Sequence, residues 1–236
     1  VGDTDFVTVP VEGMLDKDYL ESRAELINEF YPNDMGQAAP GELDGFDPYA
    51  PDNTAKDSGT SHVSIVDRYG NALSMTTTIE SSFGNGVMVR GFLLNNELTD
   101  FSFAPTDASG TPIANRVEPG KRPRSSMSPT IVFDAAGEVE IVTGSPGGSR
   151  IIAYTAQSIV NMIDFGLDPQ QAINVPHYMN RNGSTDLEAS IPGITLDYDV
   201  DALKAALEAR GHPVNVTALT SGLSIIQIVD GDLVGG

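Results

Sequence analysis

Two short turns, each set between two β-rich runs, constrain the fold of this chain more than any other sequence feature. Residues Ser61–Asp67 and Asn71–Ile79 form the first pair of runs, and Pro129–Asp134 and Glu138–Thr143 form the second. Each pair is separated by three residues ending in Gly, which is typical of a tight reversal between antiparallel strands. The sequence therefore predicts two β-hairpins, whose apolar faces the rest of the chain has to cover.

Helical spacing of apolar residues marks much of the remaining structure. The helices predicted in this way are Lys17–Phe30, Gly147–Gly166, Asp168–Asn174 and Asp199–Ala209, and a last strand is predicted at Leu223–Val229. Hairpins followed by helices and a further strand favour a layered α+β fold, in which helices pack on the faces of antiparallel sheets.

Two polar segments, Tyr31–Gly59 and Ala104–Gly120, are rich in Pro, Gly and Asp and predict long loops. Loops of this length are uncommon inside compact domains and are often functional. Between them, Gly91–Asn95 predicts a short buried strand. The helix at 147–166 is expected to bury one apolar stripe, which consists of Ile151, Ile152, Ala156, Ile159, Val160 and Ile163.

The composition excludes several classes of function. Thirteen Lys and Arg against 33 Asp and Glu give a net charge of −20 over 236 residues, which argues against nucleic acid or an anionic membrane as a partner. The absence of Cys excludes disulfides, thiolate metal sites and a Cys nucleophile. The spacing of His62, His177 and His212 fits no zinc pattern, so we expect structural roles for them. No apolar run approaches the roughly 18 residues of a membrane span.

The junction between the acidic loop and the first hairpin, at Thr60, admits two interpretations. Thr is common where a strand starts, and on pattern alone this interpretation is favoured. In the other, Thr60 is an N-terminal nucleophile. A Thr hydroxyl needs a base beside it, and a cut before Thr60 would free an α-amine with a pKa near 8 to act as that base. Gly59 suits such a cut, because a residue without Cβ tolerates a strained peptide.

Further candidate groups follow this junction in the chain. Thr76–Thr78 runs along the partner strand, with Thr77 on the opposite face, and one of these hydroxyls could bond the nucleophile; β-propensity alone also explains the run. Glu97 and Asp100 are three residues apart, so their carboxylates could converge on a substrate ammonium, although solvated acids in a turn are the default in an acidic chain.

Two segments, one basic and one rich in glycine, could bind an anion. Residues 121–129 (KRPRSSMSP) hold three of the thirteen basic residues and clustered hydroxyls, which suit a carboxylate or form a solvated basic loop. Residues 143–150 (TGSPGGSR) lead from a strand into a helix, where backbone N–H groups suit an anion or an oxyanion. This segment matches neither a Walker loop nor the dinucleotide-binding fingerprint.

Five segments occur in one order at compact spacing: Thr60–Asp67, Asn71–Gly84, Phe92–Ser102, Lys121–Val132 and Thr143–Arg150. Together they strongly resemble the small-subunit half of the γ-glutamyltranspeptidases, which are N-terminal-nucleophile hydrolases also named glutathione hydrolases. The resemblance implies a four-layer αββα sandwich. It also implies that residues 1–59 are the C-terminal segment of the large subunit with a linker loop. Residues 60–236 would be the small-subunit catalytic region without its C-terminal end.

The resemblance assigns catalytic roles. Thr60 would be the nucleophile and the new N-terminus after autocatalytic cleavage at Gly59–Thr60. Thr78 would bond the nucleophile and support this cleavage, and the N–H groups of Gly147 and Gly148 would form the oxyanion hole.

The resemblance assigns the binding of substrate as well. Glu97 and Asp100 would hold the α-ammonium of a γ-glutamyl group, with Glu80 at a position where family members have Asn or Glu. Ser125 and Ser126 would bind its α-carboxylate. The segment 104–117 corresponds to a lid loop over the site.

The activity implied is γ-glutamyl transfer and hydrolysis on glutathione and other γ-glutamyl amides through a covalent intermediate on Thr60. Water or an amino acid is the acceptor, no metal or organic cofactor is needed, and the remainder of the large subunit is a partner. A periplasmic or secreted bacterial location is expected. Two alternatives stay open: a class IV cephalosporin acylase or other amidase on the same fold, and an uncleaved, catalytically silent homologue that binds a ligand.

Overall fold

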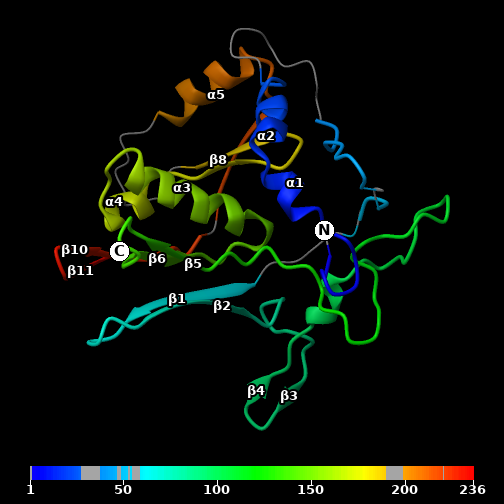
Figure 1. The fold of residues 1–236 in the computed structure, drawn as a ribbon, viewed down its shortest axis with the longest axis horizontal. Coiled ribbons are helices and arrows are strands. Elements are labelled where there is room, and N and C mark those ends of the chain that lie inside the picture. The colour runs from blue at the N-terminus through cyan, green and yellow to red at the C-terminus, as the bar shows by residue number, and fades with distance from the viewer. Residues whose placement is uncertain are drawn as a thin grey trace.

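The computed structural model describes residues 2–27, 38–46, 49–52, 54, 59–189, 199–219 and 221–236. Its centre has three layers (Figure 1). Helices α3 (Ile151–Ile163) and α4 (Pro169–Asn174) cover one face of a four-stranded sheet, and a hairpin covers the other face. The remaining elements lie around these layers.

The first predicted hairpin is confirmed. Strand β1 (Thr60–Val66) pairs antiparallel with β2 (Ala72–Thr78), and the register places Thr60 opposite Thr78. Asp67 shapes the turn, because its carboxylate accepts hydrogen bonds from two backbone N–H groups of the turn at 2.8 and 3.0 Å. This hairpin brings the end of the linker next to the end of β2.

The second predicted hairpin is also confirmed and extends into a larger sheet. Strand β5 (Thr130–Phe133) pairs with β6 (Val139–Gly144), β6 pairs with β10 (Ser224–Val229), and β10 pairs with β11 (Asp232–Gly235), all antiparallel. The apolar core lies between this sheet and its helices, and its most buried members are Ile141, Met162, Ala172 and Ile225.

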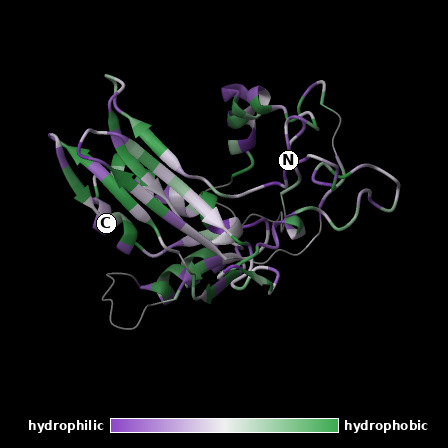
Figure 2. Ribbon diagram, turned by 90° about the horizontal axis from the view of Figure 1, so that it is seen from below, coloured by the Kyte–Doolittle hydropathy of each residue, from purple (hydrophilic) through white to green (hydrophobic). Residues whose placement is uncertain are grey.

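The two β layers meet through polar side chains. Ser64 Oγ donates to the carbonyl of Ser224 at 2.9 Å, and Ser74 Oγ donates to the carbonyl of Thr143 at 2.8 Å. Three outward side chains of the hairpin are apolar and 43–46% exposed: Ile65, Leu73 and Met75. Figure 2 shows this alternation of polar and apolar residues along the strands. The α+β class is confirmed, and the described residues supply three of the four expected layers.

A smaller sheet lies apart from these layers. It consists of β7 (Tyr178–Asn180), β8 (Thr185–Glu188) and β9 (Val214–Thr217), and the pairing of β8 with β9 is parallel. Helix α5 (Val200–Glu208) follows β8 in the chain, and Asp199 caps it by accepting from a backbone N–H at 2.9 Å. The sequence predicts α5 but none of these strands, since each has only three or four residues.

The N-terminal region begins with two short helices. Helix α1 (Val11–Leu15) was not predicted, and α2 (Lys17–Ala24) is the first part of the helix expected at 17–30. Asp16 caps α2 by accepting from Tyr19 N at 3.0 Å. Residues 28–30 and much of the loop expected at 31–59 lie outside the described residues.

Two predictions of burial are wrong. Of the buried strand expected at Gly91–Asn95, only β4 (Phe92–Leu93) forms; it pairs with β3 (Met88–Val89), and Phe92 is 60% exposed. The buried face of α3 consists of Ile151, Tyr154, Thr155, Ser158 and Met162, whereas Ile152, Val160 and Ile163 are exposed. A polar face can turn inward here because Ser158 Oγ donates to a carbonyl of its own helix at 2.9 Å.

Two 3₁₀ turns, η1 (Glu97–Asp100) and η2 (Gly148–Arg150), complete the described elements. A capping box starts α4, with Asp168 and Gln171 exchanging hydrogen bonds. None of the helices in the described part of the chain has the length and apolar character that crossing a membrane requires.

Candidate active site

Thr60 lies where the linker enters the hairpin. As the first residue of β1 it lines a cavity of about 320 Å³, together with Gly59, Thr78 and Ser81. The hydroxyl of Thr78 donates a hydrogen bond to the carbonyl oxygen of Gly59. The backbone N–H of Glu80 donates to the same hydroxyl at 2.8 Å, which fixes its orientation. The carbonyl of the predicted scissile bond is therefore polarised by a donor that is itself held in place.

This arrangement adds to two of the expectations. The resemblance gives Thr78 the nucleophile as its partner, and in the structure the hydroxyl of Thr78 donates to the carbonyl of Gly59, the residue before Thr60. The need for Gly59 comes from a close approach of backbone. A Cβ at Gly59 would lie 2.5 Å from the carbonyl oxygen of Glu80 and 3.2 Å from the carbonyl carbon of Ser81.

His62 joins the nucleophile strand to the sheet behind it. Its Nδ1 lies 2.8 Å from Thr76 Oγ1, and its Nε2 lies 3.2 Å from Ser64 Oγ. The ring packs directly on Gly144, where a Cβ would lie 2.5 Å from Nδ1. Burial lowers the pKa of His62, so the ring is neutral near pH 7. This geometry fits the structural role expected for His62, which is two residues from Thr60 on the same face of β1.

His177 is, like His62, a histidine whose ring is packed against neighbours and hydrogen-bonded. It is 4% exposed and stacks on Tyr154, with ring centroids 4.2 Å apart. Its Nε2 lies 2.9 Å from Ser221 Oγ, and burial lowers its pKa to about 4. His212 follows α5, and its backbone N–H donates to a carbonyl of that helix at 3.1 Å.

Three predicted acids come together; none of them lines the Thr60 cavity, but Glu80 lies in the chain between Ile79 and Ser81, which do. The carboxylates of Glu80, Glu97 and Asp100 offer oxygen atoms that all lie within 4.8 Å of one another. Glu80 is 6% exposed and has a φ of 73°, a conformation that is uncommon for a residue with Cβ. Asn96 connects η1 to the end of β2, because its side chain accepts from the N–H of Ser81 at 2.9 Å.

The acid cluster concentrates negative charge. Burial raises the pKa of Glu97, and the neighbouring charge and hydrogen bond of Asp100 raise it further. Three carboxylates at this spacing suit a cationic ligand, either an ammonium group or a hard divalent ion.

The basic segment at 121–124 is not a free positive patch. Each of its cations has a carboxylate partner: Lys121 with Glu118 at 2.8 Å, Arg122 with Asp3 at 2.7 Å, and Arg124 with Asp52 at 3.6 Å. The hydrogen bonds from Arg122 hold the pKa of Asp3 below its ordinary value. These ion pairs favour the alternative interpretation, a basic loop whose charges are balanced by acidic residues.

The other predicted binding residues lie in loops. Ser125 Oγ accepts from the N–H of Met127 at 3.1 Å, and Ser126 accepts from Ser128 Oγ through its carbonyl at 3.0 Å. Neither serine is among the residues that line the Thr60 cavity. Their role in binding a carboxylate therefore stays a prediction.

The glycine turn lies between β6 and α3. Gly147 and Gly148 have φ values of 138° and 59°, which favour glycine. Gly144 touches His62, so the turn begins at the end of the sheet nearest to Thr60. Neither glycine is among the residues that line the Thr60 cavity, and their role as an oxyanion hole stays a prediction.

The loop expected to act as a lid contacts the linker. Ala50 N donates to the carbonyl of Pro112 at 3.0 Å, and Ala50 forms a parallel bridge with Ile113.

Two further carboxylates are buried, those of Asp3 and of Asp52 in the same linker. Their Arg partners lie far along the chain, so no local pattern marks them.

Comparisons with known proteins identify the relatives of the chain. The family model of gamma-glutamyltranspeptidase matches residues 1–236. The glutathione hydrolase proenzyme of Escherichia coli K12 is 39% identical over 246 aligned positions, which cover 100% of this chain and 39% of that protein. The chain thus spans about two fifths of the length of this relative.

Two solved structures show the same fold. A mutant of the γ-glutamyltranspeptidase of Helicobacter pylori matches with a TM-score of 0.63 at 35% identity, covering 74% of this chain and 96% of that chain. The cephalosporin acylase of Bacillus halodurans matches with a TM-score of 0.77 at 26% identity, covering 100% of this chain and 39% of that chain.

Proposed function

The chain belongs to the γ-glutamyltranspeptidase family, and we propose that in its full-length protein Thr60 first cleaves the Gly59–Thr60 bond and then transfers γ-glutamyl groups. One observation carries this proposal. The nucleophile strand begins at Thr60, and the carbonyl of Gly59 beside it accepts a hydrogen bond from Thr78 within an open cavity. Nucleophile, electrophile and polarising donor are thus adjacent before any rearrangement.

The cleavage is an acyl shift followed by hydrolysis. Thr60 Oγ attacks the carbonyl carbon of Gly59, the C–N bond breaks, and the nitrogen of Thr60 takes the hydroxyl proton. The resulting ester joins Gly59 to Thr60 Oγ. Water then hydrolyses this ester, which leaves a carboxylate on Gly59 and a free amine on Thr60. Residues 1–59 would end one subunit and residue 60 would begin the other.

The free amine then serves the transfer reaction. As Thr60 Oγ attacks the γ-amide carbonyl of the donor, the α-amine takes its proton and passes it to the departing amine. The γ-glutamyl group remains on Thr60 as an ester until water or the amine of an amino acid attacks it. The N–H groups of Gly147 and Gly148 would stabilise the oxyanion, where losing one donor typically costs about 10²–10³ in rate.

The acid cluster supports a γ-glutamyl donor. An α-ammonium placed among Glu80, Glu97 and Asp100 would relieve the repulsion between carboxylates within 4.8 Å of one another. An acyl group with an ammonium fits this charge better than a purely acidic acyl group. Ser125 and Ser126, with the remainder of the large subunit, would bind the α-carboxylate.

The likeness to a cephalosporin acylase supports a second candidate, an amidase that acts on another acyl group. The deciding experiment uses the full-length protein. Its denatured mass is followed over hours, and kcat/KM is measured on a γ-glutamyl anilide and on glutaryl-cephalosporanic acid. We expect two chains that meet at Gly59 and Thr60, and a preference for the anilide.

Thr60→Ala is the matched variant and should abolish both cleavage and transfer. Continued cleavage at Gly59 in this variant would refute the role of Thr60. A preference for the cephalosporin would favour the acylase, and a single uncut mass would favour a silent homologue. The periplasmic or secreted location is also a proposal, and cell fractionation of the native host tests it.

A further inference from the structure

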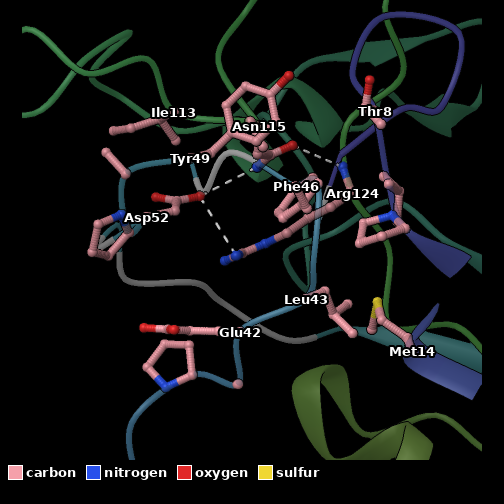
Figure 3. Close-up of a pocket in the computed structure, with 18 of the residues that line it drawn as sticks. Thr8, Met14, Glu42, Leu43, Phe46, Tyr49, Asp52, Ile113, Asn115 and Arg124 are labelled. Atoms are coloured by element: carbon pink, nitrogen blue, oxygen red, sulfur yellow. Dashed lines mark hydrogen bonds and ion pairs between the residues drawn. The ribbon is translucent and has the colours of Figure 1, made fainter. Parts of the chain in front are cut away.

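One buried carboxylate upstream of the cleavage site takes no part in the chemistry above. The side chain of Asp52 is 6% exposed. Its Oδ2 accepts from Asn115 Nδ2 at 3.3 Å and lies 3.6 Å from Arg124 Nη1, as the dashed lines in Figure 3 show. Its Oδ1 accepts from the backbone N–H of Thr54 at 3.0 Å. We name Asp52, Asn115 and Arg124 the Asp52 clamp.

The clamp connects the linker to the candidate active site. Asn115 is 1% exposed, and its Nδ2 also donates to the carbonyl of Asp100, in the acid cluster, at 2.7 Å. Its Oδ1 accepts from the backbone N–H of Arg124, the residue before Ser125, at 2.9 Å. One buried amide therefore fixes the linker, the acid cluster and the loop of the predicted carboxylate site relative to one another.

Polar contacts rather than close packing hold the linker at this point. The clamp residues line a cavity of about 690 Å³ that also includes Phe46 and Tyr49 of the linker (Figure 3). Beyond the clamp, Phe103 N donates to Thr54 Oγ1 at 3.2 Å. The bonds of Asp52 and Thr54 thus lie beside open space, next to the contact that Ala50 makes with Ile113.

Asp52 is suited to holding the linker in one position. Burial on its own would raise the pKa of Asp52, but the hydrogen bonds from Thr54 and Asn115 and the charge of Arg124 lower it. An ionised carboxylate in a buried position requires its partners, so its place is closely determined. Its partners Asn115 and Arg124 lie after the scissile bond in the chain, so the clamp spans that bond.

The distance along the chain makes this placement relevant to cleavage. The six residue steps from Thr54 to Thr60 span at most about 22 Å when fully extended. We propose that Asp52 is a positioning residue for self-cleavage, which through Asn115 and Arg124 keeps the carbonyl of Gly59 beside the hydroxyls of Thr60 and Thr78. The inference rests on the proposed cleavage at Gly59–Thr60.

The test compares Asp52→Asn and Asp52→Ala with wild type in the full-length protein. Asp44→Asn is the matched control, since Asp44 is an exposed carboxylate of the same linker. The fraction cleaved is followed by denatured mass, and kcat/KM on a γ-glutamyl anilide is measured for the cleaved fraction. Melting temperatures are compared in the uncleavable Thr60→Ala background.

We expect Asp52→Ala to slow cleavage about 10²-fold, which is the cost of roughly 1 Å of misplacement. Asp52→Asn keeps the shape of the side chain but not its charge. Because one charge-assisted contact is weakened, we expect the rate of cleavage to fall about 10-fold. The cleaved fraction should keep wild-type kcat/KM, and Asp44→Asn should cleave at the wild-type rate.

Two outcomes would overturn the inference while leaving the proposed function intact. In the first, wild type and both Asp52 variants cleave at the same rate. In the second, slower cleavage comes with a lower melting temperature and with a loss of kcat/KM in the cleaved fraction as large as the loss of cleavage rate. A general structural role of Asp52 would have these effects. If wild type itself stays uncut, the proposed function and this inference fall together.

Discussion

A methyl group at Gly144 tests whether the packing of His62 sets the position of the nucleophile. A Cβ at this position would lie 2.5 Å from Nδ1 and 2.7 Å from Nε2 of His62, whereas ordinary contacts begin at 3.4 Å. The ring therefore has to move by about 1 Å, which is the difference between these distances. It cannot move alone, because its two nitrogens are bonded to Thr76 and Ser64.

The displacement should pass along β1 to Thr60. Overpacking of this kind typically destabilises a protein by about 1–3 kcal/mol. A shift of 1 Å in a reacting group costs roughly 10² in rate. We therefore expect Gly144→Ala in the full-length protein to slow self-cleavage about 10²-fold. Denatured mass against time gives the rate, and urea unfolding of the uncleavable Thr60→Ala form gives the change in stability.

A second substitution separates this mechanism from a general defect. His62→Ser removes the ring that the methyl group strikes, so the pair Gly144→Ala with His62→Ser should cleave faster than Gly144→Ala alone. Gly183→Ala is the control, since a Cβ at Gly183 meets no atom within 4 Å. The reasoning fails if Gly144→Ala cleaves at the wild-type rate or if the second substitution brings no recovery.

Three further predictions concern the cleavage site, the acid cluster and the core. Gly59→Ala should slow cleavage, measured by denatured mass, because its methyl group would lie 2.5 Å from the carbonyl oxygen of Glu80; cleavage at the wild-type rate would contradict the close approach. The pKa of Glu97 is raised, and a cationic donor requires its ionised form, so KM for a γ-glutamyl anilide should rise as pH falls through that raised pKa. Glu97→Gln should flatten this dependence, and an unchanged profile would argue against contact with the ammonium. The pKa of His177 is lowered from 6.5 to about 4, so its contribution to stability is complete above pH 6.5 and is lost as pH falls through about 4. The loss should reach at most about 3 kcal/mol, at 1.36 kcal/mol per pKa unit, in urea unfolding of the Thr60→Ala form. His177→Gln should remove the dependence, and equal slopes in both proteins would refute the assignment.

Local signals explain which parts of the fold are predictable from the sequence. Both hairpins are marked by glycine turns, and the starts of α4 and α5 are marked by Asp168 and Asp199, whose side chains cap them. The parallel pairing of β8 with β9 has no such mark, because each strand is four residues long and depends on its neighbours for stability. Apolar spacing predicts the wrong buried face of α3 for a related reason. Ser158 can be buried because its hydroxyl donates a hydrogen bond within the helix.

The same distinction applies to the candidate site. The spacing of Glu97 and Asp100 already indicated that their carboxylates could converge, whereas the contribution of Glu80 followed from the family resemblance. Asp3 was missed because its partner Arg122 lies 119 residues further along the chain. In segment 121–124, Lys121 pairs with Glu118 only three residues away, whereas Arg122 and Arg124 pair with acids far away in the sequence, so no local pattern shows that these two charges are balanced.

Thr78 shows how one hydroxyl can serve both proposed reactions. Before cleavage it accepts from the N–H of Glu80 and donates to the carbonyl of Gly59, so its single proton is directed at the scissile bond. Cleavage converts that carbonyl into a carboxylate on a separate chain end, which is free to leave the cavity. The proton of Thr78 then becomes available to Thr60, opposite it in the hairpin register, while the N–H of Glu80 still holds the oxygen. Thr78→Val should therefore slow cleavage of the Gly59–Thr60 bond more than it slows transfer by the cleaved protein. A Thr78→Val variant that cleaves at the wild-type rate but transfers slowly would contradict this reasoning.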